Sequence, residues 1–428
     1  MSADLDALAR SILKDNDLGG YTIPTKGLYP YQWNWDSIFV ALGFATFDQD
    51  RALEEIESLF EGQWDDGMVP HILFRKDDPS YFPGPDAWGT SDRAMPSSGH
   101  SQPPVAATVV REIFESAGEG KLEARVRALF PKMMAWHRWF ATYRDPQGHG
   151  SVAIIHPWES GRDNLPDWDA PMSAVDTTGI PAFTRKDTAH VDPEMRPRQI
   201  DYERYMAIVA AGRACGWNAR KVTQASPFLV ADPGITFILL RANRDLAALA
   251  RRLGFDADLP EIEGWIAKLE RGLERLWNPE LGAHTTLDLK TGKLGQGVSS
   301  VAFLAPYAGV RDEAVLAPLR AHFDRIAGRV DYMVPSYDPD HQGFEHLRYW
   351  RGPVWAVVNF MIARGLTQAG DHTRAERVRA DTARLVKHSG FAEYFSPVDG
   401  TGAGGKSFSW TAAVWLAWAS PNPSQRAA

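Results

Sequence analysis

The stretch GPVWAVVNFMIARGL, residues 352–366, is apolar nearly all the way round a helical projection. A helix without a polar face must be buried on every side. Two further stretches have the same character, SIFVALGFA at 37–45 and FSWTAAVWLAWA at 408–419. Helices enclosed in this way need other elements packed around them, so the three stretches predict the inside of a large helical fold.

Other stretches of the chain predict helices with only one apolar face. In 261–277 apolar residues recur at three- and four-residue spacing, with Glu, Lys and Arg between them. In 371–387 a similar stripe follows Asp371, which can cap the first turn. Strand patterns are scarce. Enclosed helices that alternate with one-faced helices predict an all-α fold, a double-walled helical barrel in which six inner–outer pairs fit residues 1–428 as a single domain.

Composition restricts the class of partner. The net charge of −8 and the lack of basic runs argue against nucleic acid or an anionic membrane as a partner. Cys215 is the single cysteine, which excludes an internal disulfide and a thiolate zinc cage. The acidic start MSADLDALARSILKDND does not have a secretory pattern, and no apolar stretch is long enough to span a bilayer. We expect a cytoplasmic protein that acts on a small molecule, with a homo-oligomer left open.

Each enclosed stretch is preceded by polar and aromatic residues. These are YPYQWNWD (29–36), HLRYWRG (346–352) and AEYFSPVDGTGAGGKS (392–407). If the inner helices run parallel, their N-termini gather at one rim of the barrel, which is then the candidate site. Pro353 is expected in the first turn of its helix. Three long irregular segments are expected to lie over that rim: 75–103, 156–197 and 331–349.

Acidic residues among Trp and Gly are the candidates for catalysis. A carboxyl group between aromatic rings is desolvated, which raises its pKa and suits it to donate a proton. The alternative is that these acids cap helices or pair with Arg162, and spacing alone does not decide between the two. The candidates are Glu159, Asp163, Asp167 and Asp169 in HPWESGRDNLPDWD, and Glu393 in FAEYFSPVDG.

Six segments taken in chain order resemble glycoside hydrolase family 63, most closely its bacterial mannosylglycerate and glucosylglycerate hydrolases. They are YPYQWNWDSIF, GQWDDGMVPHILF (62–74), SQPP (101–104), HPWESGRDN, YWRGPVWAVVNF (349–360) and EYFSP…FSWTAA. The resemblance implies an (α/α)6 barrel and an inverting glycosidase that releases glycerate from a small α-glycoside. It also implies that Asp163 is the general acid and Glu393 the general base.

The resemblance further implies a set of substrate contacts, and no cofactor or metal ligand. Asp36 would accept sugar hydroxyls, although it can equally cap a helix starting at Ser37. Arg204, with Tyr205 beside it, would bind the acid end of the aglycone, unless Arg204 simply pairs with Asp201. The segment around Lys406 and Ser407 departs from the family pattern, which leaves the aglycone in doubt. The remaining contacts implied are Tyr29, Trp33, Trp35, His71, Tyr81, Gln102, Trp158, Gly161, Tyr349, Trp350, Arg351 and Trp355.

Three other functions remain open. One is an α-glucosidase acting on another small glucoside or disaccharide. A sugar epimerase would need a pair of basic groups in the cavity, typically histidines. A sugar-binding protein would need the aromatic residues but not two opposed acids. The sequence does not decide whether the sugar is glucose or mannose, what the oligomeric state is, or whether a structural ion is bound. The segment DPDHQGFEHLRY (338–349) is interpreted as a turn, since Tyr349 stands where a calcium loop needs Glu.

Overall fold

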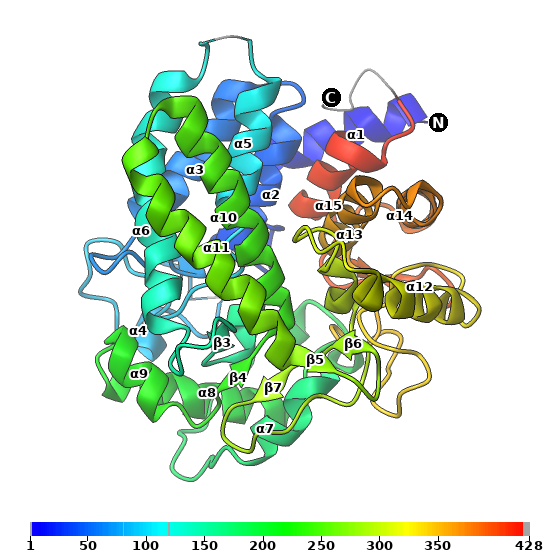
Figure 1. Cartoon of the computed structure of the whole chain (residues 1–428). Coiled ribbons are helices and arrows are strands. Elements are labelled where there is room, and N and C mark those ends of the chain that lie inside the picture. The colour runs from blue at the N-terminus through cyan, green and yellow to red at the C-terminus, as the bar shows by residue number, and fades with distance from the viewer. Residues whose placement is uncertain (1, 80, 119, 423–428) are drawn as a thin grey trace.

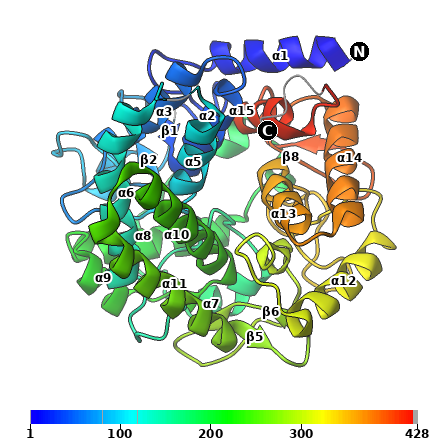
Figure 2. The ribbon, with the colours of Figure 1, turned by 45° about the horizontal axis from the view of Figure 1, so that its top comes forward.

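The computed structural model describes residues 2–79, 81–118 and 120–422, and helices dominate it (Figure 1). The chain alternates between an outer and an inner ring of helical elements (Figure 2). The outer ring consists of α1 (Ser2–Asp15), α3 (Gln49–Glu61), α6 (Glu123–Tyr143), α11 (Leu259–Leu273), α12 (Glu313–Ala327) and α14 (His372–Ser389). The inner ring consists of α2 (Asn34–Phe44), α5 (Ala106–Ser116), α10 (Pro233–Leu253), the 3₁₀ helix η7 (Ser300–Leu304), α13 (Ala356–Gln368) and α15 (Ser409–Val414), which continues as η8 (Trp415–Ala419).

The inner ring is closed. Each inner element contacts the next along the chain, and the last helix, α15, contacts the first, α2. The three enclosed stretches predicted from sequence become α2, α13 and α15, and every residue of α2 is buried. The expected double-walled helical barrel is therefore confirmed.

The one-faced helices lie in the outer ring, as predicted. The buried residues of α11 include Ile262, Leu269 and Leu273, which form its inward face. Asp371 caps α14, because its side chain accepts a hydrogen bond from the Arg374 N–H at 3.3 Å. The apolar stripe of each helix therefore packs toward the inner ring.

Smaller elements fill the connections, mostly at one end of the barrel (lower part of Figure 1). The strands are two residues long and pair antiparallel, and no described helix is long and apolar enough to cross a membrane. The connecting helices are α4 (Pro85–Trp88), α7 (Asp169–Ser173), α8 (Gln199–Ala214), α9 (Ala219–Ala225), η1 (Pro157–Ser160), η2 (Pro166–Trp168), η3 (Asp187–Ala189), η4 (Pro193–Met195), η5 (Asp256–Asp258) and η6 (Glu274–Leu276). The strands are β1 (Gln32–Trp33), β2 (Ile72–Leu73), β3 (Ala153–Ile154), β4 (Val230–Ala231), β5 (Trp277–Asn278), β6 (Ala283–His284), β7 (Leu287–Asp288), β8 (Tyr394–Phe395) and β9 (Gly402–Ala403).

Two expected helix starts are wrong. Pro353 does not lie in the first turn of α13, which begins at Ala356. The reason is that Val354 is extended and exchanges two backbone hydrogen bonds with Phe395, at 2.7 and 3.0 Å, so the helix starts only after it. Asp36 does not cap a helix either, because α2 already begins at Asn34 and Asp36 lies inside its first turn.

Candidate active site

A cavity opens where the segments that precede the inner helices meet. Its empty space measures about 790 Å³, counted with the open space at its mouth. Its walls come from the segments before α2, α5, α13 and α15, as expected for a rim of helix N-termini. The three long irregular segments expected over this rim contribute to the same walls, for example through Tyr81, Arg196 and Tyr349.

Most of the residues predicted for the site line this cavity. Arg204, Tyr205, Arg351 and Trp355 do not. Those that line it are Tyr29, Trp33, Trp35, Asp36, His71, Tyr81, Gln102, Trp158, Gly161, Asp163, Tyr349, Trp350 and Glu393.

The structure separates Asp163 from the other acids of its segment. Glu159 is buried and paired with Arg144 at 2.7 Å. Asp167 accepts hydrogen bonds from Tyr337 and Thr286, and Asp169 pairs with Arg351. Of these four acids only Asp163 lines the cavity, and no hydrogen bond joins its carboxyl oxygens to another described residue.

The turn that carries Asp163 is held from several sides. Gly161 precedes it with φ +68°, and a Cβ there would lie 2.7 Å from the Trp35 ring, so only glycine fits. Arg162 forms a buried ion pair with Asp232, the cap of α10, and its carbonyl accepts the Trp168 indole N–H at 2.7 Å. These ties leave the Asp163 side chain facing the cavity. Burial, with the nearby Glu393 carboxylate, raises the pKa of Asp163 to about 7, even though Arg196 acts to lower it.

Glu393 lies just before β8, and both of its carboxyl oxygens are held. Oε1 accepts a hydrogen bond from the Tyr29 hydroxyl at 2.9 Å, and Oε2 accepts the Gly405 backbone N–H at 2.8 Å. The Arg196 guanidinium lies 3.8 Å from Oε1. Burial raises the pKa of Glu393 above its usual range, while Arg196 and these donors act to lower it. The result is a buried carboxyl group with a fixed orientation.

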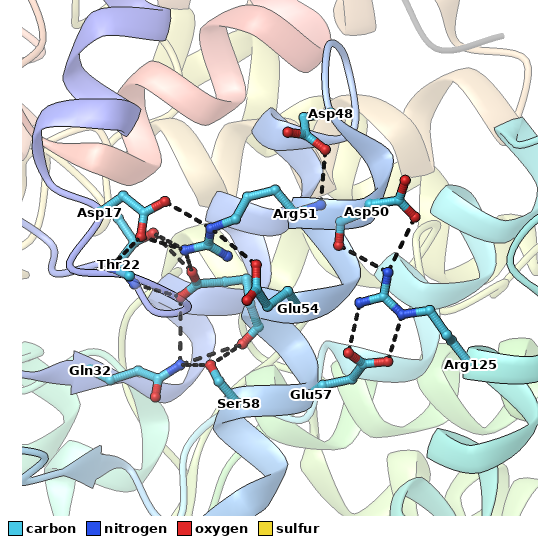
Figure 3. A network of polar contacts seen from close by, with 12 residues as sticks. Asp17, Thr22, Gln32, Asp48, Asp50, Arg51, Glu54, Glu57, Ser58 and Arg125 are labelled. Carbon is cyan, nitrogen blue, oxygen red and sulfur yellow. Dashed lines mark hydrogen bonds and ion pairs between the residues drawn. The ribbon is translucent and has the colours of Figure 1, made fainter.

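Asp36 is a further carboxyl group of the cavity. It is buried, and desolvation together with Glu393 and Asp163 raises its pKa well above the ordinary value. The segment that leads to it is joined to a polar network on α3, where Gln32 donates a hydrogen bond to Ser58 (Figure 3). There Arg51 pairs with Asp17 at 2.8 Å and with the fully buried Glu55 at 2.7 Å. Glu55 in turn accepts hydrogen bonds from the N–H and the hydroxyl of Thr22.

Several cavity residues were not predicted. Arg196 is almost fully buried, donates to Asp187 at 3.0 Å and to the Tyr29 hydroxyl at 2.8 Å, and lies 4.2 Å from the centre of the Tyr349 ring. Both Arg196 and Tyr202 come from RPRQIDYERY, the stretch that also contains Arg204 and Tyr205. The sequence contained a signal that favours Arg196 as the cavity residue, because Arg196 stands in the irregular segment before α8, whereas Arg204 stands within the helix. The other unpredicted residues are Pro24, Leu28, Phe82, Pro83, Lys186, Asp187, His190, Phe408 and Trp410.

The four predicted residues outside the cavity support it or lie away from it. Arg351 pairs with Asp169 at 2.7 Å, and Trp355 stacks on Trp350 with ring centres 3.8 Å apart. Tyr205 is buried on α8 and its hydroxyl donates to the backbone carbonyl of Asp163 at 2.7 Å. Arg204 is half-buried on the same helix.

Known proteins resemble the chain along nearly its whole length. The family described as mannosylglycerate hydrolase MGH1-like glycoside hydrolase domain matches residues 29–411. The mannosylglycerate hydrolase MGH2 of Selaginella moellendorffii is 46% identical over 98% of this chain and 86% of that protein. A glucosylglycerate hydrolase of Mycolicibacterium hassiacum is 32% identical over 97% of each chain. The crystal structure of the GH63 mannosylglycerate hydrolase from Thermus thermophilus in complex with Tris and D-glycerate superposes with a TM-score of 0.92, at 45% identity over 96% of this chain and 98% of that one.

Proposed function

The chain belongs to glycoside hydrolase family 63, in its mannosylglycerate hydrolase MGH1-like branch, and is a glycoside hydrolase; we propose that it hydrolyses mannosylglycerate or glucosylglycerate with inversion at the anomeric carbon. The observation that carries the proposal is the pair Asp163 and Glu393. Both line one cavity, and their surroundings differ in the way that an acid and a base require.

In the proposed reaction, Asp163 donates its proton to the glycosidic oxygen. A pKa of about 7 keeps this carboxyl group largely protonated in mildly acidic solution and about half protonated at neutral pH. Glu393 takes a proton from a water molecule, which attacks the anomeric carbon from the opposite face. The bond to glycerate breaks, and the sugar leaves with inverted configuration.

The sugar is proposed to bind among Trp33, Trp35 and Tyr81. Aromatic faces pack against its C–H groups, and Asp36 accepts hydrogen bonds from its hydroxyls. Gln102 uses its amide oxygen to accept the Trp35 backbone N–H at 3.3 Å, which leaves its NH₂ group to donate to a sugar oxygen.

We assign the carboxylate of glycerate to Arg196 instead of Arg204, because only Arg196 lines the cavity. Lys186 lines the same cavity and adds a second basic side chain for an anionic aglycone. An arginine fork also matches the two oxygens of a carboxylate.

A hydrolysis screen tests this proposal. Mannosylglycerate, glucosylglycerate and neutral glucosylglycerol are incubated with the protein, and proton NMR follows the released sugar during the first minutes. We expect cleavage of at least one glycerate glycoside, with the β-anomer appearing first. Cleavage of the neutral glycoside alone would refute the glycerate assignment, and early release of the α-anomer would refute inversion.

Arginine variants test the aglycone contact. Arg196→Ala should lower kcat/KM on the glycerate glycoside by about 10- to 150-fold, the equivalent of one hydrogen bond to a charged group. Arg204→Ala is the matched control and should change it little. A larger loss in Arg204→Ala than in Arg196→Ala would return the role to Arg204.

A further inference from the structure

Three buried groups connect the turn of Asp163 to helix α8. The Tyr205 hydroxyl donates to the Asp163 carbonyl at 2.7 Å, and the Tyr205 backbone carbonyl lies 3.2 Å from Nε2 of His156. Nδ1 of His156 accepts the backbone N–H of Trp158 at 3.0 Å, at the start of η1. His156 and Tyr205 are each 1% exposed. The segment 156–163 is thus bonded to one residue of α8 at both of its ends.

The hydrogen bonds define the protonation of His156. A backbone N–H can only donate, so Nδ1 must be the unprotonated nitrogen and Nε2 must carry the hydrogen. Nε2 then donates to the Tyr205 carbonyl. The imidazole is neutral, in agreement with its pKa, which burial lowers to about 3. His156 therefore keeps the same bonds over the whole pH range in which the enzyme would work.

We propose that Tyr205 is a positioning residue for the general acid: through its hydroxyl it fixes the Asp163 backbone, and through its carbonyl it is itself fixed by His156. The inference rests on the proposed role of Asp163. The Asp163 carboxyl has no side-chain hydrogen-bond partner among the described residues, so its direction depends on its backbone. Tyr205 also packs against Trp158, with ring centres 5.2 Å apart, and Trp158 lines the cavity beside Asp163.

Removing a hydroxyl that only stabilises the fold has different consequences from removing one that orients the general acid. Without the Tyr205 hydroxyl, the carbonyl of Asp163 loses its donor and the turn relaxes toward water. Proton donation is then impaired, whereas sugar binding and the base side are untouched. Glu393, Arg196 and Asp36, the charged groups facing Asp163 in the cavity, remain in place.

Two substrates separate these consequences. The glycerate glycoside needs a proton on its leaving oxygen, whereas the α-glycosyl fluoride of the same sugar does not, because fluoride leaves as an anion. For Tyr205→Phe we expect kcat on the glycerate glycoside to fall about 10- to 100-fold with little change in KM, as for a misaligned reacting group. Activity on the fluoride should be retained, which also shows that the variant is folded.

The pH profile provides a second readout. Water that reaches the Asp163 carboxyl removes part of the desolvation that raises its pKa. The alkaline limb of kcat should therefore move to lower pH by about half a unit or more in Tyr205→Phe. Equal losses on both substrates, or an unshifted limb with normal kcat, would overturn the inference.

Two controls complete the experiment. Tyr307→Phe removes a tyrosine hydroxyl of similar burial, 4% exposed, outside the cavity, and should leave kcat and the pH profile unchanged. Asp163→Asn is measured in parallel. If Asp163→Asn is impaired and Tyr205→Phe is not, the positioning role fails alone; if Asp163→Asn is fully active, the proposed acid itself fails.

Discussion

The proposed acid and the proposed base of the cavity are held in opposite ways. Asp163 is held through its main chain, by Tyr205 on its own carbonyl and by the ties on Arg162, while its carboxyl group faces the cavity. Glu393 is held through its carboxyl group itself, by the Tyr29 hydroxyl on one oxygen and the Gly405 N–H on the other. Glu393 is buried and Asp163 is partly buried, and only the Glu393 carboxyl group is surrounded by donors.

This difference acts on the pKa values of the two carboxyl groups, both of which burial raises. Donors that point at oxygen favour the anion, so Glu393 is suited to accept a proton. A carboxyl group without such donors keeps the effect of desolvation, and the pKa of Asp163 is raised to about 7. The neighbouring carboxylate strengthens the contrast, since Glu393 itself acts to raise the pKa of Asp163.

The largest effect is expected from removing either group. Asp163→Asn and Glu393→Gln should each lower kcat on the glycerate glycoside by about 10²- to 10⁴-fold, the usual contribution of placed proton transfer. On the glycosyl fluoride only Glu393→Gln should be slow, because the water still needs its base. Steady-state kinetics on both substrates measures this, and near-normal turnover in either variant would remove that residue from its role.

A smaller loss is expected from disturbing the support of the base. Gly404 has φ +72°, and a Cβ there would lie 2.2 Å from Oε2 of Glu393. Gly404→Ala should therefore displace the carboxylate and lower kcat about 10²-fold, as for a misplaced reacting group. Gly370→Ala is the matched control, because Gly370 also has positive φ, +81°, but open space around it. If both variants lose activity equally, backbone strain and not the contact with Glu393 is responsible.

The smallest effect is expected in the pH dependence of kcat/KM. The acid must be protonated and the base ionised, so kcat/KM should fall as pH rises through about 7 and fall again as Glu393 becomes protonated at low pH. Arg196→Gln removes the cation that lowers both pKa values, so both limbs should move to higher pH. Rates measured from about pH 4 to 9 span both limbs, and an alkaline limb that does not move in this variant would contradict the assignment to Asp163.

The two rings can be predicted from sequence because the burial of a helix determines whether it carries a polar face. A helix enclosed on all sides has no polar face, and 37–45, 352–366 and 408–419 show this directly. Helix starts are harder to predict from sequence, since the late start of α13 depends on pairing between Val354 and Phe395, which are distant in sequence. A strand partner at that distance is not visible in the local pattern.

The site was predictable in its segments and less so in its individual residues. Spacing does not separate Asp163 from Glu159 and Asp169, because their partners Arg144 and Arg351 come from other parts of the chain. Family resemblance selected Asp163 and Glu393, whose roles stay predictions. Resemblance placed the aglycone contact on Arg204, which lies within α8, whereas Arg196, which lines the cavity, lies in the irregular segment before that helix.

The inner ring closes through helices from both ends of the chain, so the proposed site is completed late in folding. The Tyr29 hydroxyl and the Glu393 carboxylate are 364 positions apart in sequence, and they meet only when α15 packs against α2. Contacts of such high sequence separation form slowly, because the entropy of closing a long loop opposes them. If Glu393 has its proposed role, we expect a chain growing on the ribosome to be inactive until its last inner helix has emerged, and the recovery of hydrolysis during refolding should report when the two ends of the chain come together.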